Sequence, residues 1–164
     1  MAERARIRGA QNGSASDLEA LFREHWPRAY RAAYLVVHDA AAAEDIAQEA
    51  FLAAVRSLDR FDRSRPFGPW LHRIAVNRAI DWTRARKLRA EAEEHDVAAP
   101  ASAESDERVL PALASLDAEQ RAVIVLRYLL EYTPGEIANL LELPRGTVNS
   151  RLRRGLDKLK EGLE

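Results

Sequence analysis

The sequence contains no cysteine and no long apolar run, and these absences exclude several classes of protein. Without cysteine, the chain of 164 residues has neither a disulfide framework nor thiolate catalysis. No apolar run approaches the roughly 20 residues needed to span a bilayer. The first residues, MAERARIRG, lack the apolar segment of a secretory signal. We therefore expect a soluble cytoplasmic protein that does not insert into a membrane.

Patterns for catalysis and metal binding are also missing. The histidines His25, His38, His72 and His95 show no i, i+4 pairing that suggests a metal, and there is no glycine-rich phosphate loop or nucleophile motif. We therefore expect no catalytic residue, no metal and no cofactor. The sequence has only seven glycines and few strand-like alternations, whereas Ala, Leu, Arg and Glu are abundant. This composition predicts an all-α fold.

The segment 133–154, TPGEIANLLELPRGTVNSRLRR, is typical of a helix-turn-helix. Thr133 and Glu136 have the spacing of a capping box, and the sequence LPRG at 143–146 breaks the first helix. A second, basic helix then runs to Lys160 and fits a DNA major groove, where Arg and Asn contact base edges. The alternative is an ordinary helical hairpin with a solvated basic face. The predicted DNA contacts are Arg145, Thr147, Asn149, Ser150, Arg153 and Arg154.

The net charge of −1 conceals three strongly charged segments. Residues 60–90 carry nine Lys or Arg against two Asp, a local charge of +7. Residues 145–160 carry six against one Asp, a local +5, and residues 91–107 carry seven acidic residues and no Lys or Arg. Two basic patches separated by an acidic tether suit a nucleic-acid-binding protein, although all three segments could also be solvated surface.

Apolar spacing predicts two helical domains. In the first, a helix opens at Ser16 and bends or restarts at Pro27, a second begins at the cap Asp39, and a third runs from about Trp70 to Arg86. Asp117 and Gln120 form a further capping-box candidate in the second domain. The expected divisions are an N-terminal tail (1–16), a first domain (17–90), an acidic flexible linker (91–108) and a second domain (109–164).

Three segments together resemble the bacterial sigma factors of the extracytoplasmic-function (ECF) class, within the sigma-70 family. AEDIAQEAFLAAV (43–55) and FGPWLHRIAVNRAIDWTRARK (67–87) look like parts of sigma region 2, the latter being its promoter-melting helix. Residues 116–160 look like region 4. The resemblance implies a sigma factor, not an enzyme, that binds core RNA polymerase, directs it to promoters through −35 and −10 elements, and promotes strand opening.

The resemblance also implies partners and further site residues. The partners would be promoter DNA, the clamp helices of the largest polymerase subunit, the flap of the second largest, and an anti-sigma factor, with which the family often pairs. An acidic helix face, otherwise a solvated surface, would meet polymerase through Glu44, Asp45, Gln48 and Glu49. Aromatic faces and Arg hold unstacked bases for ~1–3 kcal/mol each. The −10 and melting residues would be Arg60, Phe61, Arg63, Ser64, Arg65, Phe67, Trp70, Arg73, Asn77 and Arg84, with core packing as the alternative for Phe67 and Trp70.

Two sites depart from the family pattern, and one glycine weakens the predicted recognition helix. Glu142 stands in the helix-turn-helix turn, where the family usually has Gly, so the turn either costs ~1 kcal/mol in a left-handed conformation or is built differently. Gly155 weakens the recognition helix by up to ~1 kcal/mol. The pair Gly68-Pro69 is unusual before the melting helix, and it leaves the preferred −10 base open.

The length of the linker limits how the domains reach a promoter. The −10 and −35 elements lie about two helical turns, roughly 70 Å, apart, which leaves ~50 Å between two small domains. Eighteen residues, 91–108, reach ~60 Å when extended but only ~25 Å as a random coil. We therefore expect a stretched linker that lies along a surface such as polymerase.

Two other functions stay open for the chain. One is an autonomous helix-turn-helix regulator, which leaves the basic aromatic loop at 58–69 unexplained, and the other is an enzyme.

Overall fold

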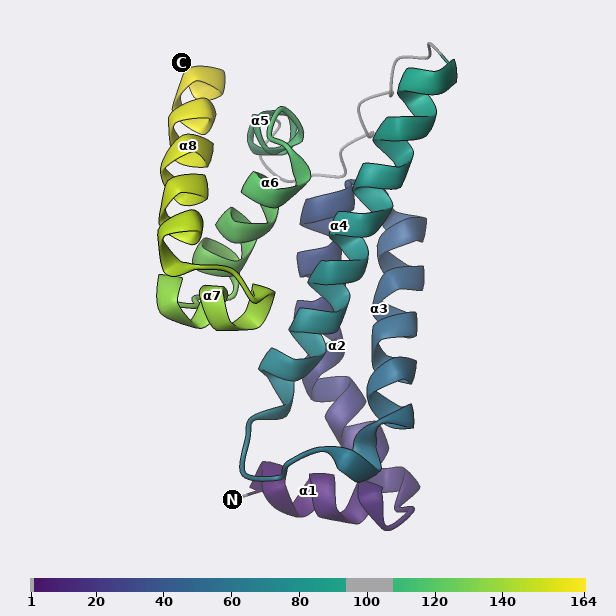
Figure 1. Ribbon diagram of the computed structural model, residues 1–164. Coiled ribbons are helices and arrows are strands. Elements are labelled where there is room, and N and C mark those ends of the chain that lie inside the picture. Colours follow the sequence, from purple (N-terminus) through teal and green to yellow (C-terminus); the bar gives the residue numbers. More distant parts are fainter. Residues whose placement is uncertain (1, 94–107) are drawn as a thin grey trace.

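The computed structural model describes residues 2–93 and 108–164, and every regular element within them is helical (Figure 1). The predicted all-α fold is confirmed. Most of the predicted linker, residues 94–107, lies outside the described residues, and so does His95. Among the helices that are described, none has both the length and the apolar character required to cross a membrane.

The N-terminal unit is a bundle of three long helices with a short helix across one end (Figure 1). Its elements are α1 (Ala2–Gln11), α2 (Ala15–Val37), α3 (Ala40–Arg56), the 3-10 turn η1 (Leu58–Arg60) and α4 (Phe67–Glu93). Helix α1 lies within the segment that we expected to be a tail, and its Ile7 is fully buried. Ile7 joins a core cluster with Leu21, Phe51 and Leu71.

Local signals set most helix starts in this unit. Asp39 caps α3 as predicted, because its carboxylate accepts a hydrogen bond from the Ala42 N–H at 3.0 Å. The predicted cap Ser16 is wrong: Ser14 caps α2 and accepts from the Asp17 N–H at 3.3 Å. The predicted restart at Pro27 is also wrong, since α2 runs through this residue as one helix.

The C-terminal unit consists of four short helical elements and the longer helix α8. They are α5 (Val109–Ala114), α6 (Ala118–Ile124), the π-helical turn η2 (Val125–Leu129), α7 (Pro134–Leu141) and α8 (Arg145–Leu163). The predicted capping box of α7 is confirmed in both of its hydrogen bonds, between Thr133 and Glu136. The turn from α7 to α8 is built with Glu142 in the left-handed region, at φ 56° and ψ 47°, so this turn carries the conformational cost expected of a non-glycine residue.

Gly155 has a packing reason to be glycine. A Cβ at this position would lie 2.6 Å from the Cδ1 atom of Ile124, because α8 crosses α6 closely there. The loss of helix propensity at Gly155 therefore accompanies a close helix crossing.

The two units pack against each other through a shared apolar core. Val36 and Val76 from the N-terminal unit belong to the same buried cluster as Val123 and Leu126 from the C-terminal unit. Buried Arg121 adds a polar link, because its guanidinium donates to the Val36 carbonyl of α2 and to the carbonyl oxygens of Leu113 (2.8 Å), Leu116 (2.9 Å) and Ala114 (3.1 Å). Burial lowers the pKa of Arg121 to about 10, so it remains charged at neutral pH.

Candidate nucleic-acid interface

The N-terminal half of α8 presents the predicted recognition side chains. Its apolar face is fixed by Val148 and Leu152, which are buried against the C-terminal core. Four predicted DNA-contacting residues are exposed and two are half-buried. Among the described residues, the side chains of this set make no hydrogen bond or ion pair, so their donors are available to a ligand. The exposed four are Arg145, Asn149, Arg153 and Arg154, and the half-buried two are Thr147 and Ser150.

The segment between η1 and α4 combines exposed cations with aromatic rings. The side chains of Arg60, Arg63 and Arg65 are exposed. Behind them the half-buried rings of Phe61 and Trp70 stack, with centroids 4.4 Å apart. A stacked pair of half-exposed rings beside several guanidinium groups is a suitable surface for unstacked bases.

Phe67 packs against the Phe61 and Trp70 rings from the core of the N-terminal unit. Its side chain is only 1% exposed, and it packs edge-on against Phe61 and Trp70 at centroid distances of 6.0 and 5.7 Å. Burial therefore assigns Phe67 to core packing, the alternative that the sequence left open, whereas Trp70 is only half-buried.

A turn of hydrogen bonds shapes the tip of the segment. The Asp62 carboxylate accepts from both the N–H (2.9 Å) and the hydroxyl (2.6 Å) of Ser64. These bonds hold the pKa of Asp62 below its usual range. Ser64, predicted as a DNA contact, is thus exposed but engaged with Asp62, and α4 begins at Phe67, three residues before the predicted start at Trp70.

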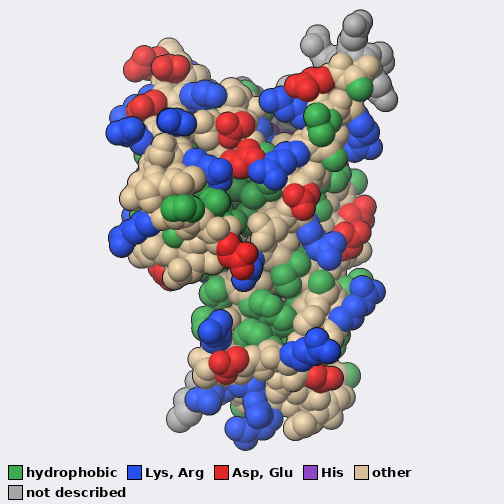
Figure 2. Space-filling view, in the orientation of Figure 1, with side chains coloured by type: hydrophobic (Ala, Val, Ile, Leu, Met, Phe, Trp, Pro, Cys, Tyr) green, Lys and Arg blue, Asp and Glu red, His purple; other side chains and the backbone are tan. Residues whose placement is uncertain are grey.

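Two arginines of α4 pair with carboxylates of the C-terminal unit. Arg73 pairs with Glu142 in the turn before α8, and Arg84 pairs with Glu119 of α6. Figure 2 shows acidic and basic side chains side by side where the two units meet. Asn77, the remaining predicted residue of this helix, is exposed. The structure therefore places two predicted melting residues at the junction between the units.

A cavity of about 680 Å³ lies between the aromatic segment and α7. Its lining includes Phe61 and Trp70 from the N-terminal unit and Tyr132 and Asn139 from the C-terminal unit. The basic aromatic surface thus faces the helix-turn-helix unit across this cavity.

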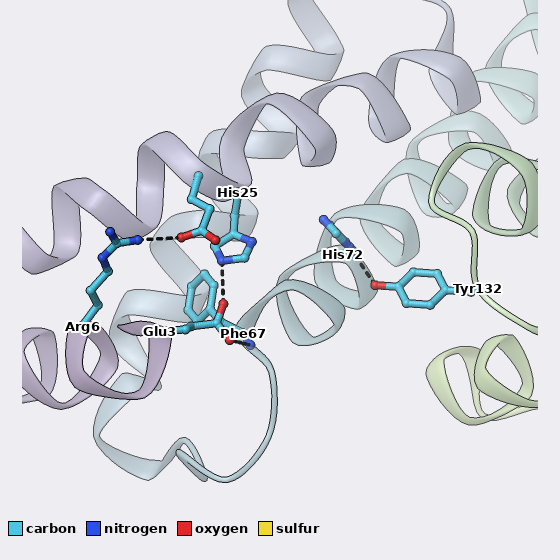
Figure 3. Close-up of polar contacts among 7 residues, drawn as sticks. Glu3, Arg6, His25, Phe67, His72 and Tyr132 are labelled. Carbon is cyan, nitrogen blue, oxygen red and sulfur yellow. Dashed lines mark hydrogen bonds and ion pairs between the residues drawn. The ribbon is translucent and has the colours of Figure 1, made fainter. Parts of the chain in front are cut away.

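Buried Tyr132 and His72 form a hydrogen bond across the same junction (Figure 3). The Tyr132 hydroxyl lies 2.8 Å from His72 Nδ1. Burial lowers the pKa of His72 to about 4 and raises that of Tyr132 to about 12, so both side chains are neutral near pH 7. Burial also lowers the pKa of His38, at the end of α2, to about 4.

The acidic face of α3 is exposed as the sequence pattern suggests, but its composition is not purely polar. Exposed Leu52 lies one turn after Gln48, and it is 51% exposed. Glu49 pairs with Arg78 of α4 at 3.0 Å, whereas Glu44 and Asp45 are exposed. Leu52 was not among the predicted residues; its position seven residues after Asp45 places it on the same helix face and could have identified it.

Comparison with known proteins gives two family matches that cover most of the chain. The model described as Sigma-70 region 2 matches residues 21–89, and the model described as Sigma-70, region 4 matches residues 112–161. The chain is 33% identical to the ECF RNA polymerase sigma factor SigW of Bacillus subtilis, covering 96% of this chain and 95% of SigW. It is 35% identical to the RNA polymerase sigma factor CarQ of Myxococcus xanthus, covering 92% and 91% of the two chains.

The arrangement of both units also resembles a solved structure. CnrH, in its complex with the cytosolic domain of CnrY, superimposes with a TM-score of 0.74 at 29% identity. The match covers 98% of this chain and 96% of CnrH.

Proposed function

The chain belongs to the extracytoplasmic-function sigma factors of the sigma-70 family, and on this basis we propose which surfaces perform each step of promoter recognition. As an RNA polymerase sigma factor it binds core polymerase and DNA, initiates transcription at promoters, and is not an enzyme. The observation that carries the proposal is the presence of two separate basic surfaces, on α8 and on the 58–84 segment, each with exposed cations. The proposed region 2 domain is 17–90, with α1 packed onto it, and the proposed region 4 domain is 109–164, after the linker 91–108.

Helix α8 is the proposed reader of the −35 element. Its first half carries exposed Arg145, Asn149, Arg153 and Arg154, while Val148 and Leu152 are buried against the C-terminal core. Arg side chains make bidentate contacts to guanine and Asn to adenine in the major groove, and each good pair discriminates by ~1–3 kcal/mol. Thr147 and Ser150 complete the proposed set through contacts to phosphate or base edges.

The aromatic segment and α4 are the proposed −10 and melting surface. Phe61 and Trp70 would stack on extruded bases, while guanidinium groups contact the phosphates of the displaced strand. Apart from Phe67, which packs beneath them, all predicted residues of this surface are retained in the proposal. They are Arg60, Phe61, Arg63, Ser64, Arg65, Trp70, Arg73, Asn77 and Arg84.

The exposed face of α3 is the proposed contact with the clamp helices of the largest polymerase subunit. Polar side chains there can pair with basic groups, and exposed Leu52 supplies an apolar centre of the kind that protein interfaces bury. The proposed face comprises Glu44, Asp45, Gln48, Glu49 and Leu52. We assign the flap of the second largest subunit to the region 4 domain.

The two domains must separate for both surfaces to reach one promoter. The −10 and −35 elements are roughly 70 Å apart, whereas here the two units share one core. Separation would also release Arg73 and Arg84 from Glu142 and Glu119, and phosphates would take the place of these carboxylates.

A partner protein that holds the domains together would act as an anti-sigma factor. Support comes from CnrH, whose solved complex contains the cytosolic domain of CnrY and 96% of whose length matches this chain. We place the action of this chain in the cytoplasm, where polymerase and chromosome lie.

Run-off transcription from a promoter library, with core polymerase alone and with this protein, tests the proposal. We expect protein-dependent transcripts whose promoters share two spaced motifs. Specific DNA binding without polymerase, in the absence of such transcripts, would instead support an autonomous helix-turn-helix regulator.

A further inference from the structure

Helix α1 has one face that is directed inward. Glu3, Ile7 and Gln11 are spaced four residues apart and therefore lie on one side of the helix. Ile7 is fully buried in the core cluster that also holds Phe51, Leu58 and Phe67. This face packs against α2 and η1, so α1 lies directly beneath the segment that carries the aromatic surface.

Gln11 fixes the first end of that segment. Its side-chain Nε2 donates to the carbonyl oxygens of Leu58 (2.8 Å) and Phe61 (3.1 Å). Leu58 is the first residue of η1, and its carbonyl also accepts from the Phe61 N–H at 3.0 Å, whereas Phe61 directly follows the last residue of η1. One amide group therefore uses both of its N–H donors to hold the backbone on which the Phe61 ring is mounted.

Glu3 fixes the second end (Figure 3). Its Oε2 accepts from the backbone N–H of Phe67, the first residue of α4, at 3.4 Å. A carboxylate is favourable there, because the first N–H groups of a helix lack partners and carry partial positive charge. Glu3 Oε1 lies 3.0 Å from His25 Nε2, and Arg6 pairs with Glu24 at 2.9 Å, so two polar links tie α1 to α2.

The segment between these two ends has few hydrogen bonds of its own. From Asp62 to Pro66 its hydrogen bonds are local to the turn, with Arg65 N–H donating to the Asp62 carbonyl at 3.0 Å and Ser64 bonding to the Asp62 side chain. Its arginine side chains are exposed. The position of its aromatic and basic groups therefore depends on how its ends are held.

We propose that α1 is a brace for residues 58–67, and that Gln11 and Glu3 are positioning residues for strand opening. The inference rests on the proposed −10 function of that segment. Gln11 and Glu3 need not touch DNA; they reduce the conformational freedom that the segment would otherwise lose when it captures a base.

The test uses the full chain with core polymerase and compares Gln11→Ala and Gln11→Glu with the wild type. Glu has nearly the same shape as Gln but presents no donor to the two carbonyl groups. We expect both variants to reduce strand opening, measured by permanganate reactivity of unpaired thymines, by about three- to tenfold. Core polymerase binding should stay unchanged. Asn12→Ala is the matched control, since exposed Asn12 adjoins Gln11 and its side chain makes no hydrogen bond within the described residues.

A double-mutant cycle with Phe61→Ala separates positioning from general stability. If Gln11 acts through the segment, the fold-reduction in strand opening of the double variant should be smaller than the product of the fold-reductions of the two single variants. Fully multiplicative losses, or normal opening in Gln11→Glu, would overturn the brace. Should Gln11→Ala fail to fold, Glu3→Ala provides the same test at the other end.

The same cycle distinguishes failure of the brace from failure of the proposed function. Normal opening in Phe61→Ala would remove the −10 role of the segment, and the brace with it. Reduced opening in Phe61→Ala, together with normal opening in Gln11→Glu and Glu3→Ala, would reject the brace alone.

Discussion

The two basic helices differ in how their cations are engaged. In the described residues, Arg145, Arg153 and Arg154 of α8 form no ion pair, whereas Arg73 and Arg84 of α4 pair with carboxylates of the other unit. The surface on α8 can therefore meet DNA as it stands. In the function proposed above, the surface on α4 first has to exchange Glu142 and Glu119 for phosphates.

This difference indicates where promoter opening is restrained. The exposed ion pairs themselves contribute little, on the order of 0–1 kcal/mol each. The larger restraint is the apolar core that the two units share and the buried bond between His72 and Tyr132. We therefore predict that −35 binding is possible in the packed form, whereas −10 capture is coupled to domain separation.

Acidification should produce the largest effect, because it acts on the buried histidines. His38 and His72 have a pKa of about 4 in the folded chain against an ordinary 6.5, so the unfolded chain binds more protons between these values. Their stabilising contribution is complete above pH 6.5 and is lost as pH falls toward 4. When the pH falls from 7 to 5, each of the two histidines should lower the free energy of unfolding by about 2 kcal/mol.

Urea denaturation at both pH values measures this loss. In His72→Gln the part of the loss due to His72 should disappear, leaving that of His38. An equal pH-dependent loss in wild type and variant would contradict the proposed burial of neutral His72.

Arg154→Ala tests the proposed −35 surface on α8. It should weaken −35-dependent transcription by roughly tenfold, since a bidentate base contact is worth ~1–3 kcal/mol. Binding to core polymerase should be intact, as measured by fluorescence anisotropy. Lys160→Ala, on the exposed last turns of the same helix, is the control and should change transcription less than about twofold. Equal losses in transcription and in polymerase binding would contradict the assignment.

Phe61→Ala tests the proposed −10 and melting surface, which the aromatic segment and α4 form. It should spare closed-complex formation and reduce strand opening by about fivefold, because a stacked base contributes ~1–3 kcal/mol. Leu88→Ala, an exposed apolar residue further along α4, controls for loss of surface area. Arg63→Ala should act in the same direction. Normal permanganate reactivity in both loop variants would exclude the segment from melting.

Glu119→Gln should give the smallest effect. It removes the carboxylate that pairs with Arg84 at the junction, and such a partly exposed pair is worth only a few tenths of a kcal/mol. The affinity for single-stranded DNA carrying the −10 sequence should rise about twofold, with Glu161→Gln unchanged. A decrease in this affinity would mean that the pair does not compete with DNA.

Local chemistry explains which parts of the fold could be predicted. The caps at Asp39 and Thr133 depend on residues within one helical turn, and both are confirmed. Ser14 and Ser16 offer the same chemistry two residues apart, so the sequence does not decide between them. The inward face of α1 was present in the spacing of Glu3, Ile7 and Gln11, but Ile7 is the one large apolar residue of this helix and gives a weak periodic signal.

The candidate site was harder to predict from the sequence, because its contacts join residues that are far apart in the chain. Phe67 and Phe61 have the same side chain and lie six residues apart, and only tertiary packing makes Phe67 a core residue. The pairing of Arg73 with Glu142 joins residues far apart in the sequence, so neither charge pattern nor helical spacing reveals it. Gly155 shows the same limit, because its close contact with Ile124 depends on how two helices cross.

The distance between the two domains tests the central claim most directly. Because the chain has no cysteine, Arg23→Cys on α2 and Glu161→Cys on α8 provide unique sites for a pair of fluorophores. Energy transfer should be high in the free chain and should fall when the protein forms an open complex with core polymerase and promoter. Unchanged transfer in a complex that shows strand opening would contradict the claim that −10 capture requires the domains to separate.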